Sequence, residues 1–282
     1  MPHPLRLTSA AAALTEEIAV RDEFGAERRI SIPAERALTI FVDKRELVTL
    51  MTLGAAPELL VLGYLRNQRL VDSIADIESI TVAWDVHAAA VKTRAGIERF
   101  DEKTAKRVVT TGCGQGTVFG DLMSDLASLR LPAAADPTAR LSQSALYGLL
   151  ATMRQQESTY KSAGSVHGCA LFRQSELLTF VEDVGRHNAI DTIAGWMWLH
   201  GVEGADKTFY TTGRLTSEMV IKSAQMGVPI VVSRSGITQM GYELATRLGM
   251  ALFGRATNRH FICYCGFERF DAEPEPGRPG RE

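Results

Sequence analysis

The sequence has 282 residues, of which 45% are hydrophobic and 23% charged, as is typical of a globular protein with one large core or two smaller ones. The formal net charge of −2 argues against nucleic acid or a membrane surface as partner, so any anion site has to be local. No stretch approaches the roughly 20 apolar residues that span a bilayer. Four cysteines do not suggest a disulfide framework, and the N-terminus lacks the pattern of a signal peptide, so we expect a cytoplasmic protein with reduced thiols.

The first half of the chain predicts a small, strand-rich domain. Residues 1–16 lack periodicity, and we expect them to be disordered. Residues 17–135 then form an N-terminal α+β domain. Short β-branched runs predict strands at 38–42 and 77–83, and a helix is predicted after Pro57.

A Pro- and Ala-rich linker near 132–137 leads to a second domain at 136–270, and the tail at 271–282 is expected to be disordered. The second domain opens with a helix from Ser142 to about Gln156. Strands and helices of similar length then alternate, which predicts βαβ units and a mostly parallel sheet. The fold class is therefore α/β, or α+β for the chain as a whole. The predicted strands are 208–212, 228–233 and 250–253, and the predicted helices are 215–226 and 238–248.

Polar residues follow each of these three strands, at the edge where open parallel sheets bind ligands. Arginines and helix N-termini both favour phosphate oxygens, so we predict a phosphate or nucleotide site there. The alternative is that these residues build turns and solvated surface. No dinucleotide-binding or Walker glycine pattern is present. The residues concerned are Thr212, Gly213, Arg214, Ser217, Ser233, Arg234, Ser235, Arg255, Arg259 and His260.

A second polar motif, residues 182–188, follows an apolar strand at 177–181 and opens a helix. An aspartate before a glycine turn can cap the new helix, and the following side chains can offer donors from its first turn. The alternative is a structural cap with a surface histidine. The candidate binding residues here are Asp183, Arg186, His187 and Asn188.

Cys113 lies between two glycines after a β-branched run at 108–111. Glycines keep a thiol accessible and let backbone N–H groups approach it, which favours nucleophilic or persulfide chemistry, although a free cysteine can also be a buried small hydrophobe. Cys169 is expected in the core. Cys263 and Cys265 alternate on one face of a predicted strand, and without a second ligand pair we expect packing and no metal site.

Together these motifs resemble the FdhD family of formate dehydrogenase accessory sulfurtransferases. The resemblance runs from about Ile32 to Tyr264, and residues 182–188 are its most distinctive part. Residues 111–114 resemble the family's sulfur-carrying loop. The resemblance implies a C-terminal domain similar to cytidine deaminases, without their zinc chemistry, in a homodimer.

The resemblance also implies a mechanism. A cysteine desulfurase would load sulfur on Cys113 as a persulfide. The sulfur would then pass to bis-molybdopterin guanine dinucleotide (Mo-bisMGD), destined for the formate dehydrogenase catalytic subunit, and GDP or GMP would mimic the nucleotides of that cofactor. The segment implied to bind the cofactor is Arg255, Ala256, Thr257, Asn258, Arg259 and His260.

One position departs from the family pattern, because Gly116 stands where a second loop cysteine would complete Cys-x-x-Cys. A persulfide needs only one thiol, so transfer from Cys113 remains possible, and Cys169 could substitute if the fold brings it near. Two alternatives stay open. One is a chaperone that binds the cofactor without moving sulfur, and the other is a thiol hydrolase with His167 or His187 as general base.

Overall fold

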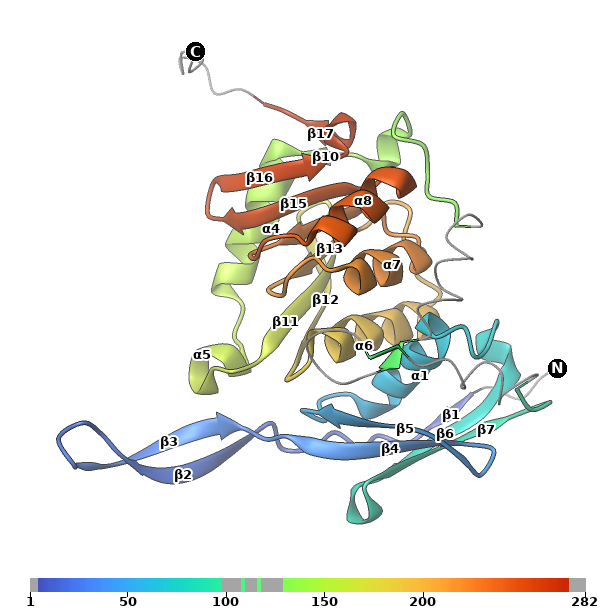
Figure 1. The fold of residues 1–282 in the computed structure, drawn as a ribbon, viewed down its shortest axis with the longest axis vertical. Coiled ribbons are helices and arrows are strands. Elements are labelled where there is room, and N and C mark those ends of the chain that lie inside the picture. Colours follow the sequence, from blue (N-terminus) through green and yellow to red (C-terminus); the bar gives the residue numbers. More distant parts are fainter. Residues whose placement is uncertain (1–4, 98–107, 110–115, 118–128, 274–282) are drawn as a thin grey trace. The chain divides into compact units, whose positions relative to one another are not determined.

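The computed structural model describes residues 5–97, 108–109, 116–117 and 129–273 (Figure 1). The chain divides into two compact units. Unit 1 comprises Met1–Leu129, Glu157–Cys169 and Phe180–Val202, and unit 2 comprises Arg130–Gln156, Ala170–Thr179 and Glu203–Glu282. The predicted mixed α/β class is confirmed. In the part of the chain that is described, no helix is long and apolar enough to cross a membrane.

Unit 1 contains a five-stranded sheet in the order β1-β6-β7-β4-β5. The strands β4 and β5 form a hairpin through Asp43 and Lys44, whose φ angles of 46° and 71° suit the tight turn that matches strand twist. The bounds are β1 (Arg6–Leu7), β4 (Arg36–Val42), β5 (Arg45–Thr52), β6 (Ile77–Ala83) and β7 (Ala88–Thr93).

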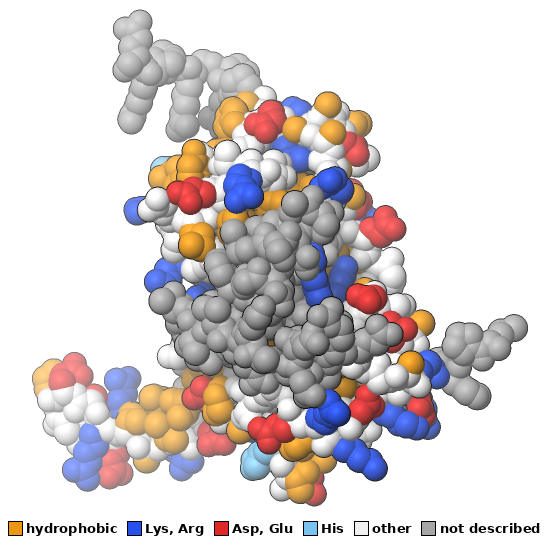
Figure 2. All heavy atoms as spheres, turned by 45° about the vertical axis from the view of Figure 1, so that its right-hand side comes forward, with side chains coloured by type: hydrophobic (Ala, Val, Ile, Leu, Met, Phe, Trp, Pro, Cys, Tyr) orange, Lys and Arg blue, Asp and Glu red, His pale blue; other side chains and the backbone are white. Residues whose placement is uncertain are grey.

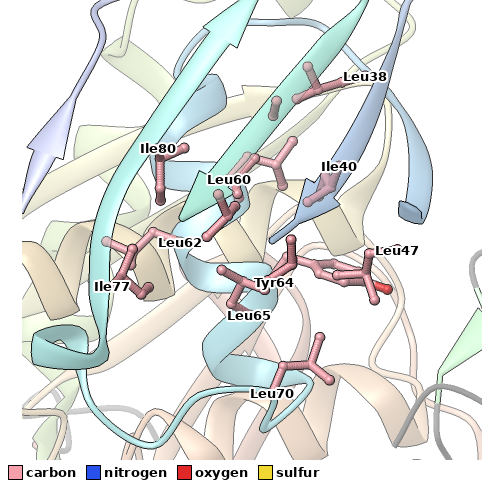
Figure 3. Packing of buried hydrophobic residues seen from close by; sticks show 14 of the residues in the cluster. Leu38, Ile40, Leu47, Leu60, Leu62, Tyr64, Leu65, Leu70, Ile77 and Ile80 are labelled. Carbon is pink, nitrogen blue, oxygen red and sulfur yellow. The ribbon is translucent and has the colours of Figure 1, made fainter. Parts of the chain in front are cut away.

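Helix α1 (Pro57–Asn67) covers this sheet, and its leucines fill the core of unit 1. Figure 3 shows Leu60 and Leu65 of α1 with Ile40 of β4 and Ile80 of β6. All four side chains are at most 1% exposed. Each such side chain contributes about 1.5–3 kcal/mol to folding through its removal from water. The predicted helix and the two predicted strands of this half are therefore confirmed.

The opposite face of α1 packs against α6 (Arg186–Leu199). A Cβ atom on Gly63 would lie 1.7 Å from the Asp191 carbonyl oxygen, and one on Gly195 would lie 2.0 Å from the Leu59 carbonyl oxygen. The two backbones can meet this closely only because both positions are glycine. This contact draws residues 180–202 into unit 1, whereas the sequence suggested that they belong to the second domain.

The N-terminal segment, expected to be disordered, makes specific contacts from residue 5 onwards. β1 pairs with β6, and the Glu58 carboxylate accepts hydrogen bonds from the Thr8 hydroxyl at 2.6 Å and the Ala10 N–H at 2.8 Å. The Trp84 indole N–H donates to the Ala10 carbonyl. These partners lie far along the chain, so the local pattern of the segment does not reveal them.

Unit 2 is built on a six-stranded sheet in the order β12-β11-β13-β14-β15-β16, whose first two strands pass from one unit to the other along their length. β13, β14 and β15 are parallel and β16 is antiparallel to β15, so the predicted parallel sheet is confirmed. The bounds are β11 (His167–Arg173), β12 (Glu176–Asp183), β13 (Thr208–Thr211), β14 (Ile230–Ser233), β15 (Ala251–Thr257) and β16 (His260–Cys265).

Three helices complete unit 2: α4 (Gln143–Gln155), α7 (Ser217–Gln225) and α8 (Gln239–Leu248). α7 begins two residues later than predicted because Leu215 is bridged to Ile237 in the neighbouring loop. Gly249 ends α8 with a φ of 64°, as expected for a glycine cap. The similarity of this domain to cytidine deaminases stays a prediction.

The remaining elements are short. β10 (Leu141–Ser142) pairs with β17 (Phe270–Asp271), and Arg140 binds the Asp271 carboxylate, so the tail expected to be disordered makes contacts up to residue 273. Residues 274–282 lie outside the described part. Unit 1 also holds α5 (Thr159–Ala163), β8 (Val108–Val109), β9 (Gly116–Thr117) and the hairpin of β2 (Thr15–Arg21) and β3 (Glu27–Pro33).

Candidate functional site

Cys113 itself lies outside the described residues. The strands on either side of it, β8 and β9, pair antiparallel, with Val109 opposite Gly116. In the sequence, β8 therefore precedes Cys113 and its partner strand β9 follows it. This agrees with the predicted strand that precedes the glycine-flanked thiol.

Asp183, at the end of β12, joins two distant parts of unit 1. One carboxylate oxygen accepts hydrogen bonds from the Thr52 hydroxyl at 2.5 Å and the Leu53 N–H at 3.1 Å. The other accepts from the Gly185 N–H at 3.0 Å and the Asn188 side-chain amide at 2.8 Å. Burial raises the pKa of Asp183 above its ordinary value, while the four donors lower it by less. Asp183 thus ties the end of β5 to the turn before α6. The sequence suggested that Asp183 caps this helix, but the capping residue is Gly185.

Glu182, the residue before Asp183, binds a different backbone segment. Its carboxylate accepts hydrogen bonds from the backbone N–H groups of Thr159 and Tyr160, at 2.5 and 3.1 Å, in the first turn of α5. A carboxylate at this place satisfies N–H groups that a helix leaves unpaired. The two adjacent acids of the motif therefore both hold backbone segments in place.

Arg186, His187 and Asn188 are 4%, 1% and 0% exposed, so the alternative of a surface histidine is wrong. Asn188 donates both to Asp183 and to the Met51 carbonyl oxygen at 2.7 Å. The first turn of α6 is thus built into the interior of unit 1. Cofactor binding by these three residues stays a prediction.

The second cluster of predicted site residues lies at the carboxyl edge of the parallel sheet in unit 2, where backbone contacts join the loops after β13, β14 and β15. The Arg234 N–H donates to the Thr211 carbonyl at 3.1 Å, and the Ser233 hydroxyl donates to the Gly213 carbonyl at 2.6 Å. The Arg255 N–H donates to the Ser235 carbonyl at 2.9 Å. The structure therefore brings together the loops of Thr212–Arg214, Ser233–Ser235 and Arg255.

Three arginines emerge from these loops: Arg214, Arg234 and Arg255 are all exposed. Their strands are neighbours in the sheet, and adjacent strands lie about 4.8 Å apart. Arg255 has a φ of 49°, at an irregularity of the β15–β16 ladder between Gly254 and Thr257. Such bulges re-aim side chains and are frequent beside functional sites. The arrangement gives this edge a local positive charge in a chain with a slightly negative total.

Two helices begin beside the same loops. A Cβ atom on Gly241, in the first turn of α8, would lie 2.6 Å from the Leu215 carbonyl oxygen, so the starts of α7 and α8 are in close contact. Ser217, the first residue of α7, is half-buried, and the buried Thr216 hydroxyl before it has no hydrogen-bond partner among the described residues. Helix N-termini and arginines together suit phosphate oxygens.

The sequence did not single out Tyr264 as a site residue. A Cβ atom on Gly254 would lie 2.4 Å from the Tyr264 ring, and one on Gly236 would lie 4.0 Å from its hydroxyl. The ring therefore lies against the glycines of two of the three loops. The only signal in the sequence was a glycine in each loop, which by itself indicates a turn.

The rest of the segment implied to bind the cofactor is arranged differently. Ala256 is fully buried, and Thr257 pairs with His260 across the β15–β16 ladder. Asn258 accepts a hydrogen bond from Arg154 at 3.3 Å, and the Arg259 guanidinium lies 5.8 Å from the centre of the Tyr147 ring. The turn is thus held against α4, and the Arg255 N–H joins this segment to the loop after β14.

Three of the four cysteines are described, and each is poorly suited to nucleophilic chemistry. Cys169 is fully buried in β11, as predicted. Burial raises the pKa of Cys263 to about 11 and raises the pKa of Cys265 as well. Within the described ranges no group of three His, Cys, Asp or Glu side chains could hold a metal ion.

Several known proteins are similar to this chain in sequence and in fold. The family model of the FdhD/NarQ family matches residues 33–271. A sulfur carrier protein FdhD from Listeria monocytogenes is 30% identical over 240 residues, which cover 85% of this chain and 91% of the relative. The Bacillus subtilis protein of the same name is 31% identical over 236 residues, which cover 83% and 88%.

A crystal structure from Desulfotalea psychrophila, described as that of a formate dehydrogenase accessory protein, has the same fold. The TM-score is 0.70 at 24% identity, and the match covers 91% of this chain and 98% of that one. The family model spans most of the sequence, including the motif at 182–188 and all three loops of the sheet edge. The chain therefore belongs to the FdhD/NarQ family.

Proposed function

We propose that the protein is a cytoplasmic sulfur carrier, active as a homodimer, that accepts sulfur from a cysteine desulfurase on Cys113 and passes it to Mo-bisMGD for formate dehydrogenase. The name shared by its relatives, sulfur carrier protein, supports the general activity. The choice of residue rests on the surroundings of the other thiols: Cys169 is buried, and burial raises the pKa values of Cys263 and Cys265, which disfavours their thiolate forms.

In the loading step the Cys113 thiolate attacks the outer sulfur of the desulfurase persulfide. A new S–S bond forms on Cys113, and the desulfurase cysteine leaves as a thiolate. In the delivery step this S–S bond breaks, Cys113 is released as a thiolate, and the outer sulfur becomes a sulfide ligand by taking two electrons from the molybdenum of the substrate. Both steps need a single protein thiol, so Gly116 in place of a second cysteine is compatible with them.

The sheet edge of unit 2 supports binding of the nucleotide parts of this substrate. Arg214, Arg234 and Arg255 supply positive charge for phosphates, and the starts of α7 and α8 supply N–H groups. GDP or GMP should therefore bind the free protein. His187, proposed as a base for a thiol hydrolase, is 1% exposed and His167 is half-buried, and neither observation favours that alternative.

The test is the intact mass of the protein after incubation with a cysteine desulfurase and cysteine. The wild type should gain the mass of one sulfur atom that a reductant removes. The triple variant Cys169→Ala/Cys263→Ala/Cys265→Ala should load equally, and Cys113→Ala should not load. Loading that survives in Cys113→Ala but disappears in the triple variant would refute the assignment of Cys113.

A further inference from the structure

The segment at 6–14 in unit 1 is bound to the start of α1, and we call it the strap. It precedes the part of the chain that the family model matches, which begins at residue 33. The Thr8 N–H donates to the Ile80 carbonyl of β6, and the Thr8 hydroxyl accepts from the Val82 N–H at 3.0 Å. The same hydroxyl donates to the Glu58 carboxylate. The strap is thus attached to both the sheet and the helix of unit 1.

The ion pairs of the strap lie at the surface. Arg6 and Lys92 both bind the Glu78 carboxylate, at 2.6 and 2.7 Å, but the two cationic side chains are 68% and 64% exposed. Figure 2 shows charged side chains of both signs next to one another on the surface of unit 1. Exposed ion pairs of this kind contribute little to the stability of a segment. The strap therefore depends on its less exposed contacts.

These less exposed contacts converge on the loop that follows β5. The Ala12 N–H donates to the Gly54 carbonyl at 2.9 Å. A Cβ atom on Gly54 would lie 3.1 Å from the Ala12 methyl and 3.0 Å from the Trp84 ring. Trp84 in turn donates its indole N–H to the Ala10 carbonyl of the strap. The strap and the Trp84 ring thus both pack closely on Gly54.

Arg36 ties the strap to the same loop a second time. One nitrogen of its guanidinium donates to the Ala13 carbonyl at 2.8 Å and to the Leu53 carbonyl at 3.3 Å. The guanidinium also lies 6.0 Å from the centre of the Trp84 ring. Release of the strap would therefore remove contacts of Arg36, Trp84 and Gly54 together.

The loop is bound on its other groups by Asp183. The Leu53 N–H and the Thr52 hydroxyl donate to the same oxygen of the Asp183 carboxylate, and the Gly54 N–H donates to the Thr52 hydroxyl at 3.2 Å. The three residues of the loop thus link the strap to the motif at 182–188. A shift of Gly54 would move both donors that Asp183 accepts from this loop.

We propose that the strap is a positioning element for the motif at 182–188. Its contacts fix the loop at 52–54, and the loop in turn fixes Asp183 and the start of α6. The inference rests on the proposed function in one respect, because it takes the motif to serve delivery of sulfur to Mo-bisMGD and not the loading of Cys113. Segments with few buried contacts detach while the rest of a domain stays folded, so the strap can be released without unfolding unit 1.

Substitution of Glu58 tests the attachment of the strap. The Thr8 hydroxyl and the Ala10 N–H bind the same oxygen of its carboxylate. A glutamine can present its carbonyl oxygen to both donors, whereas an alanine accepts from neither. Two hydrogen bonds to a carboxylate shift a local equilibrium by about 100-fold, so Glu58→Ala should release the strap and Glu58→Gln should keep it. Glu46→Ala, at an exposed position of β5, is the matched control.

Amide hydrogen exchange of the full chain measures the release. In Glu58→Ala the N–H groups of Ala12, Leu53 and Gly185 should exchange about tenfold faster or more, while those of β4 and β7 stay protected. Thr8→Val removes the strap hydroxyl at an exposed residue and should act in the same direction, whereas Thr8→Ser keeps the hydroxyl and should not. Faster exchange of Ala12 alone, with Leu53 and Gly185 as protected as in the wild type, would overturn the proposal.

Sulfur loading and sulfur delivery separate positioning from a general loss of structure. Glu58→Ala should load sulfur on Cys113 as the wild type does, but its activation of formate dehydrogenase should fall to about half or less. Glu58→Gln, Thr8→Ser and Glu46→Ala should match the wild type in both assays. Normal activation by Glu58→Ala, or loss of loading together with delivery, would overturn the role of the strap. A wild type that loads no sulfur would overturn the proposed function instead, and the exchange of Leu53 and Gly185 would still decide whether the strap positions the motif.

Discussion

Replacing Asp183 by asparagine is the sharpest test of the buried contact between β5 and α6. The carboxylate accepts two hydrogen bonds on each oxygen, and two of the four donors are backbone N–H groups, one on each side. Whichever way an asparagine amide turns, its own N–H group faces one of these backbone donors. The Thr52 hydroxyl can rotate to accept, so the less costly orientation leaves the Leu53 N–H unpaired.

A buried donor without a partner costs about 1–3 kcal/mol, and we expect Asp183→Asn to lower the free energy of unfolding by that amount at neutral pH. Urea denaturation followed by circular dichroism measures it. Asp85→Asn, at an exposed position, is the control and should stay within about 0.5 kcal/mol of the wild type. Equal stability of Asp183→Asn and the wild type would mean that the four contacts do not hold β5 to the turn before α6.

Further predictions concern the helix contact, the thiols and the sheet edge. Gly63→Ala should lower the free energy of unfolding by about 3 kcal/mol or more, because the new methyl group would clash with the backbone of α6, and no side-chain movement can relieve that clash. Leu199→Ala, at the exposed end of α6, is the control. A Gly63→Ala variant as stable as the wild type would refute the close crossing of the two helices. Burial raises the pKa of Cys263 to about 11, so about one thiol in a thousand is ionised at pH 8. The alkylation of Cys263 by iodoacetamide should therefore accelerate about tenfold per pH unit up to about pH 11, and fast alkylation at pH 8 would contradict this prediction. Arg255→Gln should weaken GDP binding, measured calorimetrically, by about tenfold and reduce its salt dependence, whereas Arg247→Gln in the last turn of α8 should bind as the wild type does. Equal GDP affinity of the two variants would remove Arg255 from the site.

Local patterns in the sequence predicted the elements that local chemistry determines. β6 was predicted at 77–83 and spans Ile77–Ala83, and α8 ends at Gly249, because strand alternation and a glycine cap are both properties of neighbouring residues. The loops after β13, β14 and β15 also meet as predicted, because the carboxyl ends of parallel strands share an edge.

Long-range contacts were the part that the sequence did not reveal. Thr52 and Asp183 are 131 positions apart, and nothing local marks Thr52 as a partner. Gly63 and Gly195 permit the crossing of α1 and α6, yet each alone reads as an ordinary helix glycine. For the same reason a contiguous division into domains missed the return of α6 to unit 1, and nothing local marked the burial of Arg186 and His187 at the start of α6.

The most direct test of sulfur transfer is activation of formate dehydrogenase in cells that lack their own sulfur carrier. The wild type and the triple variant Cys169→Ala/Cys263→Ala/Cys265→Ala should both restore formate oxidation, and Cys113→Ala, produced at the same level, should not. Restoration by Cys113→Ala would contradict the account and would favour a chaperone that binds the cofactor without moving sulfur.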